Sequence, residues 1–149
     1  MNLSTTFCGG CDMKIYTSYF ANMKRIKEKF PNVFFISIAA KKPDYIDIME
    51  YKKLAPKFSF WKIWKNNISK KGINDYYIAE YQKQVLSLLN PKIVLYELEK
   101  MTSNSEMVVL LCYEKPKDFC HRHIVADWIT KNTNTKIKEL NLGDETNES

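Results

Sequence analysis

The stretch that most constrains the fold covers residues 107–128 and reads MVVLLCYEKPKDFCHRHIVADW. Its first six residues are apolar and rich in β-branched side chains, which is typical of a strand buried in a parallel sheet. After a short polar loop, Ile124, Val125 and Trp128 recur at helical spacing. Ligands of open α/β sheets gather at the carboxyl ends of strands, so this strand–loop–helix unit predicts the position of a site.

Chemically reactive side chains are concentrated in that loop and the first helical turn. Both histidines of the chain, and one of its two arginines, lie in the tetrapeptide Cys-His-Arg-His at residues 120–123. The pattern Cys-x-Glu-Lys-x(4)-Cys-His-Arg resembles the signature of the family called domain of unknown function 488. Its positions here are Cys112, Glu114, Lys115, Cys120, His121 and Arg122.

The resemblance extends from about residue 14 to about residue 130. It implies an α/β domain of a kind found in bacteria, archaea and phages, whose members look like enzymes with no settled activity. Many members carry Asp-Val-Arg at the end of their second strand, where this chain has Ser37-Ile38-Ala39. This departure suggests a subfamily with a different pocket.

The remaining patterns predict a single three-layer α/β domain over residues 13–141. We expect a mostly parallel central sheet of four or five strands, with helices on both sides. Residues 1–12 are interpreted as an N-terminal extension and 142–149 as a disordered acidic tail. The predicted strands are 14–20, 33–40, 107–112 and 135–140, and the predicted helices are 22–30, 74–89, 91–101 and a last one ending near 131–134.

Composition narrows the function classes. Hydrophobic content of 45% indicates a globular protein, and no apolar run approaches the roughly 20 residues that span a bilayer. The first twelve residues lack the features of a secretory signal, so we expect a cytoplasmic protein with reduced cysteines. The four glycines form no phosphate-binding loop, which argues against a nucleoside triphosphatase or a dinucleotide oxidoreductase. We predict no cofactor.

A basic, aromatic excursion at residues 41–71 differs from the rest of the chain. It holds nine lysines and three acids, so its charge of +6 equals the net charge of the protein. Interleaved lysines and rings, including Trp61 and Trp64, are typical of surfaces that bind nucleic acid or nucleotides. Alternatively, the rings pack on the core while the lysines face water. Long excursions beside a site also act as lids.

The predicted catalytic residues are Cys112, Glu114, Cys120 and His121. Each cysteine is either reactive or structural: Cys112 ends the central strand, and a helix N-terminus beside Arg122 would favour a Cys120 thiolate. Glu114 is a candidate general acid or base, unless it only orients the arginine. His121 can move a proton or bind a metal ion.

The predicted substrate-binding residues begin with Arg122, whose planar guanidinium in the first helical turn suits a phosphate or carboxylate. Its alternative role is an ion pair with Glu114. Substitution of Arg122 by alanine is expected to abolish ligand binding with little effect on melting. Lys115 can add a second positive contact, and Ser18 and Tyr19 end the first strand at the same edge of the sheet.

These residues predict an enzyme that performs hydrolysis or group transfer on a nucleotide or nucleic acid. An anion seat would hold a phosphate, Glu114 would move a proton and a cysteine could act as nucleophile. One alternative is a non-catalytic nucleic-acid-binding module that uses residues 41–71. Another is a zinc protein with ligands Cys8, Cys11, Cys120 and His121.

Overall fold

Strand β4 (Met107–Cys112) lies at the centre of the sheet, as its apolar sequence predicts. The computed structural model describes residues 13–103, 105–115 and 118–142. Strands β1 (Lys14–Tyr19) and β2 (Phe34–Ser37) pair with β4 on its two sides, both in parallel. Four consecutive β4 residues, at positions 108–111, are completely buried. Both faces of this strand are therefore covered, which explains why its sequence is apolar throughout rather than alternating.

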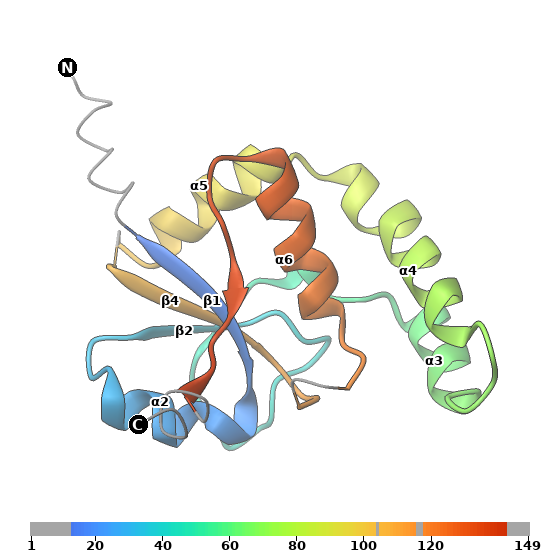
Figure 1. The fold of residues 1–149 in the computed structure, drawn as a ribbon, viewed down its shortest axis with the longest axis horizontal. Coiled ribbons are helices and arrows are strands. Elements are labelled where there is room, and N and C mark those ends of the chain that lie inside the picture. The colour runs from blue at the N-terminus through green and yellow to red at the C-terminus, as the bar shows by residue number, and fades with distance from the viewer. Residues whose placement is uncertain (1–12, 104, 116–117, 143–149) are drawn as a thin grey trace.

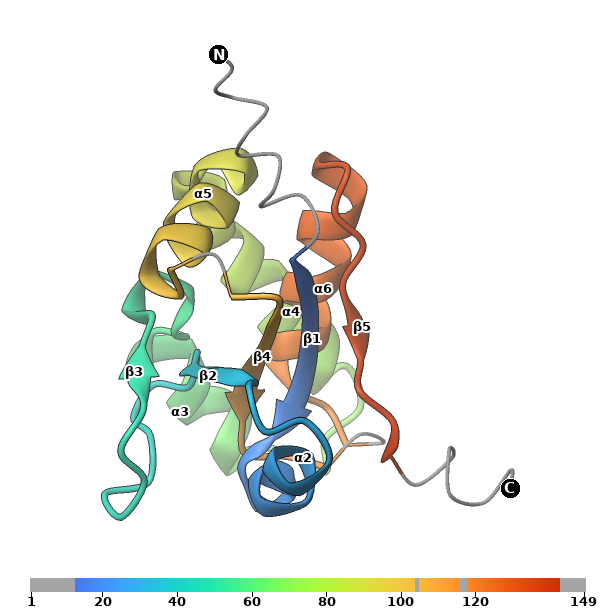
Figure 2. The ribbon, with the colours of Figure 1, turned by 90° about the vertical axis from the view of Figure 1, so that its left-hand side faces the viewer.

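The sheet, which Figure 1 shows within the fold, has five strands in the order β3-β2-β4-β1-β5, and these strands lie from left to right in Figure 2. The short edge strands are β3 (Met49–Glu50) and β5 (Lys138–Glu139), and both pair in parallel with their neighbours. The predicted α/β class and four to five parallel strands are thus confirmed. Parallel pairing puts all carboxyl ends at one edge of the sheet, where Tyr19 aligns with Cys112.

Two apolar cores lie on opposite faces of the sheet. Val108 and Leu110 of β4 belong to the larger core. Four helices contribute to the same core: α3 (Phe58–Asn66), α4 (Ile73–Gln84), α5 (Pro91–Met101) and α6 (His121–Asn132). Val109 and Leu111 belong to the other core, with Ile26 of α2 (Met23–Lys29). This alternation along one strand produces the predicted three layers: in Figure 1, α2 lies below the sheet, and α5 and α6 lie above it.

The helices largely follow the predicted ranges. They are α4 (Ile73–Gln84), α5 (Pro91–Met101) and α6 (His121–Asn132), with the 3-10 turns η1 (Phe20–Asn22) and η3 (Leu86–Leu88). Asn90 caps α5, because its side-chain oxygen accepts a hydrogen bond from the backbone N–H of Lys92 at 2.9 Å. Gly72 precedes α4 with φ of 82°, a left-handed conformation that glycine adopts without strain.

The excursion at residues 41–71 contains regular structure that the sequence analysis does not predict. Besides β3, it forms a 3-10 turn η2 (Lys52–Leu54) and helix α3 (Phe58–Asn66). Phe60 and Trp64, four residues apart, share the buried face of α3, whereas Phe58 is 67% exposed. The Trp64 indole N–H donates to the Asn74 side chain at 2.8 Å, which ties α3 to α4. Part of the excursion is therefore core, and part is surface.

The packed part of the described chain extends one residue past the predicted C-terminal boundary of the domain. Leu142, the first residue of the predicted tail, is buried with 4% exposure and packs in the second core. The domain therefore includes this residue. Residues 1–12, with the cysteines at 8 and 11, lie outside the described residues, as do 143–149. In the described part of the chain, no helix has the length and apolar character needed to span a membrane.

Candidate active site

A pocket of about 510 Å³ opens at the carboxyl end of β4. Its lining comes from the segment after β2, from α3 and α4, and from the loop between β4 and α6. The lining residues are Ala39, Ala40, Lys41, Pro56, Phe58, Trp61, Trp64, Lys65, Tyr77, Cys112, Tyr113, Glu114, Phe119, Cys120 and His121. The pocket thus lies where parallel α/β sheets place their ligands.

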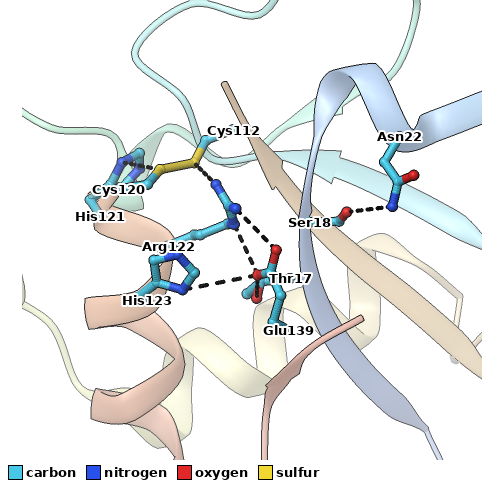
Figure 3. Close-up of polar contacts among 9 residues, drawn as sticks. All are labelled: Thr17, Ser18, Asn22, Cys112, Cys120, His121, Arg122, His123 and Glu139. Carbon is cyan, nitrogen blue, oxygen red and sulfur yellow. Dashed lines mark hydrogen bonds and ion pairs between the residues drawn. A yellow bond between two sulfur atoms is a disulfide. The ribbon is translucent and has the colours of Figure 1, made fainter. Parts of the chain in front are cut away.

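Two cysteines and a histidine form one buried cluster in the pocket lining. Cys112 ends β4, Cys120 is the N-cap residue of α6, and His121 begins that helix. Their exposures are 1%, 5% and 5%. The structure joins Cys112 and Cys120 in a disulfide (Figure 3), so the predicted reduced state is not the state seen here. The cause is proximity, because the loop returns the helix start to the end of the strand.

The His121 ring is held in one tautomer by the backbone. Its Nε2 lies 2.7 Å from the carbonyl oxygen of Ile38, and a carbonyl oxygen only accepts, so Nε2 carries the proton. Burial lowers the pKa of His121 to about 4, although the bond to Ile38 opposes this change. The ring is therefore neutral near pH 7, and its Nδ1 lone pair faces the Cys120 sulfur 3.9 Å away.

Arg122 lies behind the cluster and is fully buried. Its Nε and Nη2 each donate to a carboxylate oxygen of Glu139 at 3.0 Å, in a two-pronged ion pair. Its Nη1 lies 3.3 Å from the Cys112 sulfur, and Thr17 donates to Glu139 at 2.6 Å (Figure 3). The arginine therefore links α6, β4, β1 and β5 at one point.

Aromatic rings form the walls of the pocket. Phe119 lies 5.6 Å from Trp64 and 5.1 Å from Tyr77, measured between ring centroids. Trp61 is half-buried, with the Lys65 ammonium 6.0 Å from its ring centre. Burial, and secondarily the negative charge of Glu114, raises the pKa of Tyr77. Its hydroxyl is therefore protonated near pH 7 and available as a donor.

A family model covers the central two thirds of the chain. Its description is DUF488-N3a, the active DUF488-N3 subclade, and it matches residues 35–133. The chain belongs to the DUF488 family. A search of curated proteins and a search of solved structures each found no match. In this DUF488 protein, the matched region contains every residue of the pocket lining.

The DUF488 signature brings together most, but not all, of the predicted site. Six predicted residues line the pocket: Cys112, Glu114, Cys120, His121, Trp61 and Trp64. Ser18, Tyr19 and Lys115 do not line it. Ser18 is instead buried, where its hydroxyl accepts from Asn22 at 3.2 Å. Tyr19 packs beside Arg122, with its ring centre 6.0 Å from the guanidinium carbon.

The structure gives Arg122 a different position from the predicted anion seat. It does not line the pocket, and its partner is Glu139 rather than Glu114. The reason is that α6 turns this side chain toward β5, whose pairing with β1 the sequence does not reveal. We therefore no longer expect Arg122→Ala to leave melting unchanged.

Several pocket residues were missed by sequence reasoning. Tyr77 is predicted only as part of the helix at residues 74–89, and Phe119 is given no role. Lys41 and Lys65 were part of the lysine-rich excursion, but nothing singled them out from their neighbours. The available signal was the position of Phe119 next to Cys120, inside the signature itself.

Loss of the carboxylate at position 139 should destabilise the fold. Glu139→Ala would leave the buried guanidinium of Arg122 without its counter-ion, which costs about 3 kcal/mol or more of unfolding free energy. Urea unfolding measures this change. The matched control is Asp127→Ala, which removes an exposed pair with Lys131 and should cost about 0.5 kcal/mol or less. Equal effects of the two variants would contradict the role given to Arg122.

The neutral His121 predicts a pH dependence of stability in the metal-free protein. Its pKa is about 4 in the folded state and 6.5 in the unfolded chain, so the unfolded state binds more protons between these values. The stabilisation is complete above about pH 6.5 and is lost as pH falls toward about 4, by up to about 3 kcal/mol. Urea midpoints in EDTA should show this slope for the wild type. The slope should be smaller for His121→Gln, and identical slopes would refute the assignment.

Proposed function

We propose that this protein is an enzyme that acts on a nucleotide or on a base in a nucleic acid, by hydrolysis or group transfer. The observation that carries the proposal is one pocket that combines flat rings, lysines and a cluster of reactive side chains. Its volume, about 510 Å³, falls within the range of about 300–1,000 Å³ typical of small-molecule sites. A nucleoside monophosphate fits a site of this size.

The walls suit a planar base. Trp61 and Phe58 stack on each other on α3, with ring centroids 6.1 Å apart, and both line the pocket. Stacking on such rings is worth about 1–3 kcal/mol per base and tolerates any base, because every base has a π face. Phe58 is 67% exposed, so the stacked pair is accessible to a ligand that enters from solvent.

The lysines suit the phosphate. Lys41 and Lys65 both line the pocket and are exposed, Lys41 in the segment after β2 and Lys65 on α3. An exposed lysine is a point charge that attracts phosphate without fixing its orientation. These two lysines replace Arg122 as the proposed anion contacts.

The reactive groups lie deeper in the pocket. In the reduced protein, the cluster of Cys112, Cys120 and His121 supplies the nucleophile, and Glu114 in the same lining carries the proton. Nη1 of Arg122 donates toward the Cys112 sulfur and favours its anionic form. The Cys112–Cys120 disulfide blocks both sulfurs, so the proposed active form is the reduced one.

Loss of the Trp61 ring should weaken nucleotide binding. Trp61→Ala is expected to reduce the affinity for AMP, CMP, GMP or UMP by about 1–3 kcal/mol, or about 5- to 150-fold. Isothermal titration of the reduced protein at low salt measures this. Tyr96→Ala is the control, because this ring is 55% exposed on α5 and does not line the pocket. If no nucleotide binds, or if both variants bind equally, the proposed substrate class is wrong.

Loss of the Glu114 carboxylate should affect turnover more than binding. Glu114→Gln is expected to slow product formation by about 10²- to 10⁴-fold while nucleotide affinity changes little. Products from nucleotides and single-stranded DNA can be followed by chromatography and mass spectrometry.

The same experiment separates the enzyme from a non-catalytic binding module. The exposed rings and lysines of α3 favour such a module as the second candidate. A module would bind in a salt-sensitive way that depends on residues 57–65, and it would yield no product either as wild type or as Glu114→Gln.

A further inference from the structure

We propose that, in the reduced protein, Cys112, Cys120 and His121 form a zinc site whose fourth position faces the pocket. The potential ligand atoms of these three residues all lie within 4.8 Å of one another. Ligands of tetrahedral zinc are about 3.5–3.8 Å apart, because the bonds to sulfur and nitrogen are about 2.3 and 2.0 Å long. Small movements of the side chains therefore suffice to close the site around an ion.

The histidine is already oriented as a metal ligand. Its Nε2–H donates to the Ile38 carbonyl at 2.7 Å, and this bond leaves Nδ1 as the ring atom with a lone pair. That nitrogen lies 3.9 Å from the Cys120 sulfur (Figure 3). Metal-bound histidines characteristically donate their second ring N–H to a carbonyl or carboxylate, which fixes the tautomer and the ring orientation.

Charge balance favours a divalent cation here. Two buried thiolates without a counter-ion would be costly, and Zn²⁺ neutralises both. Arg122 contributes little net charge, because Glu139 already neutralises it through both carboxylate oxygens. Its remaining donor, Nη1, lies 3.3 Å from the Cys112 sulfur and can support a zinc-bound thiolate through an N–H···S hydrogen bond.

The disulfide and the metal are alternative states of the same two cysteines. The Cα atoms of Cys112 and Cys120 are 7.6 Å apart, whereas disulfides usually span about 4.4–6.8 Å. Two cysteines that share a metal ion can stand farther apart, because the ion lies between their sulfurs. A thiol reductant, which supplies two electrons and is itself oxidised to a disulfide, must therefore convert this disulfide to two thiols before they can bind zinc.

Three protein ligands and a pocket predict a catalytic site rather than a structural one. Structural zinc sites usually have four protein ligands, whereas catalytic sites keep one position for water, whose pKa falls to about 7. This inference rests on the proposed function and names its nucleophile. Glu114 takes a proton from the bound water, and the hydroxide forms a bond to an electrophilic carbon or phosphorus. The leaving group departs with the bonding electron pair and takes that proton from Glu114.

The zinc site can be tested without any assay of activity. The reduced protein, residues 1–149, should bind one Zn²⁺ per chain in competition with a chromophoric chelator. Cys112→Ser, Cys120→Ser and His121→Gln should each weaken binding by more than about 100-fold, since loss of supporting partners alone costs about 10- to 100-fold. His123→Ala is the matched control, because this neighbouring histidine is outside the three-residue group. The His123→Ala variant should bind zinc as tightly as the wild type does.

A second control tests whether the N-terminal cysteines, Cys8 and Cys11, bind the zinc instead. The double variant Cys8→Ser/Cys11→Ser should bind zinc as the wild type does, and its Co²⁺ form should show a thiolate-to-cobalt charge-transfer band. This readout does not require that the ligand variants fold. Loss of zinc from the double variant, no zinc in the reduced wild type, or a cobalt spectrum without thiolate bands would each overturn the proposal.

The zinc proposal and the proposed function can fail separately. Nucleotide titrations in EDTA with wild type and Trp61→Ala test the pocket without the metal. If nucleotide binding depends on Trp61 but the chain takes up no zinc, the proposed nucleotide pocket stands and the proposed zinc site is refuted. In that case Cys112 becomes the nucleophile, and its alkylation in the reduced protein should be faster than that of a free peptide thiol.

Discussion

The ion pair between Arg122 and Glu139 is the interaction on which the candidate site depends. It joins the first turn of α6 to the edge strand β5, and Thr17 of β1 bonds to the same carboxylate. A fully buried guanidinium tolerates few alternative arrangements, because each unpaired donor would be costly. The pair therefore fixes the start of α6, which in turn holds Cys120 and His121 against the end of β4.

The floor and the walls of the pocket come from different parts of the chain. The floor is the carboxyl end of the buried strand β4, and the walls come mainly from α3 and α4. Helix α3 is attached to α4 through Trp64 and Asn74, so the excursion is part of the domain rather than a separate surface. This arrangement brings aromatic rings and reactive side chains into one pocket, where the proposed zinc site would add an activated water.

Much of the fold could be predicted, because its signals are local. The apolar run of β4 and the helical spacing after it were sufficient to predict a parallel sheet and a site at its edge. Helix α3 was missed because its rings and lysines alternate in a way that also suits an extended, solvated segment. The partner of Arg122 was misassigned because Glu139 is 17 residues away and meets it only through sheet pairing.

The sequence by itself determined the class of fold, the strand end beside which the candidate pocket lies, and the residue types available there. The spacing of hydrophobic residues indicates the class of fold, and the positions of the reactive side chains along the chain indicate where they gather. Only the tertiary structure decided which of these residues share a pocket, that Arg122 supports the site from behind, and that His121 presents Nδ1 to the cysteines. Such features depend on contacts between distant segments, whose geometry is set by packing of the whole core and leaves no local pattern in the chain.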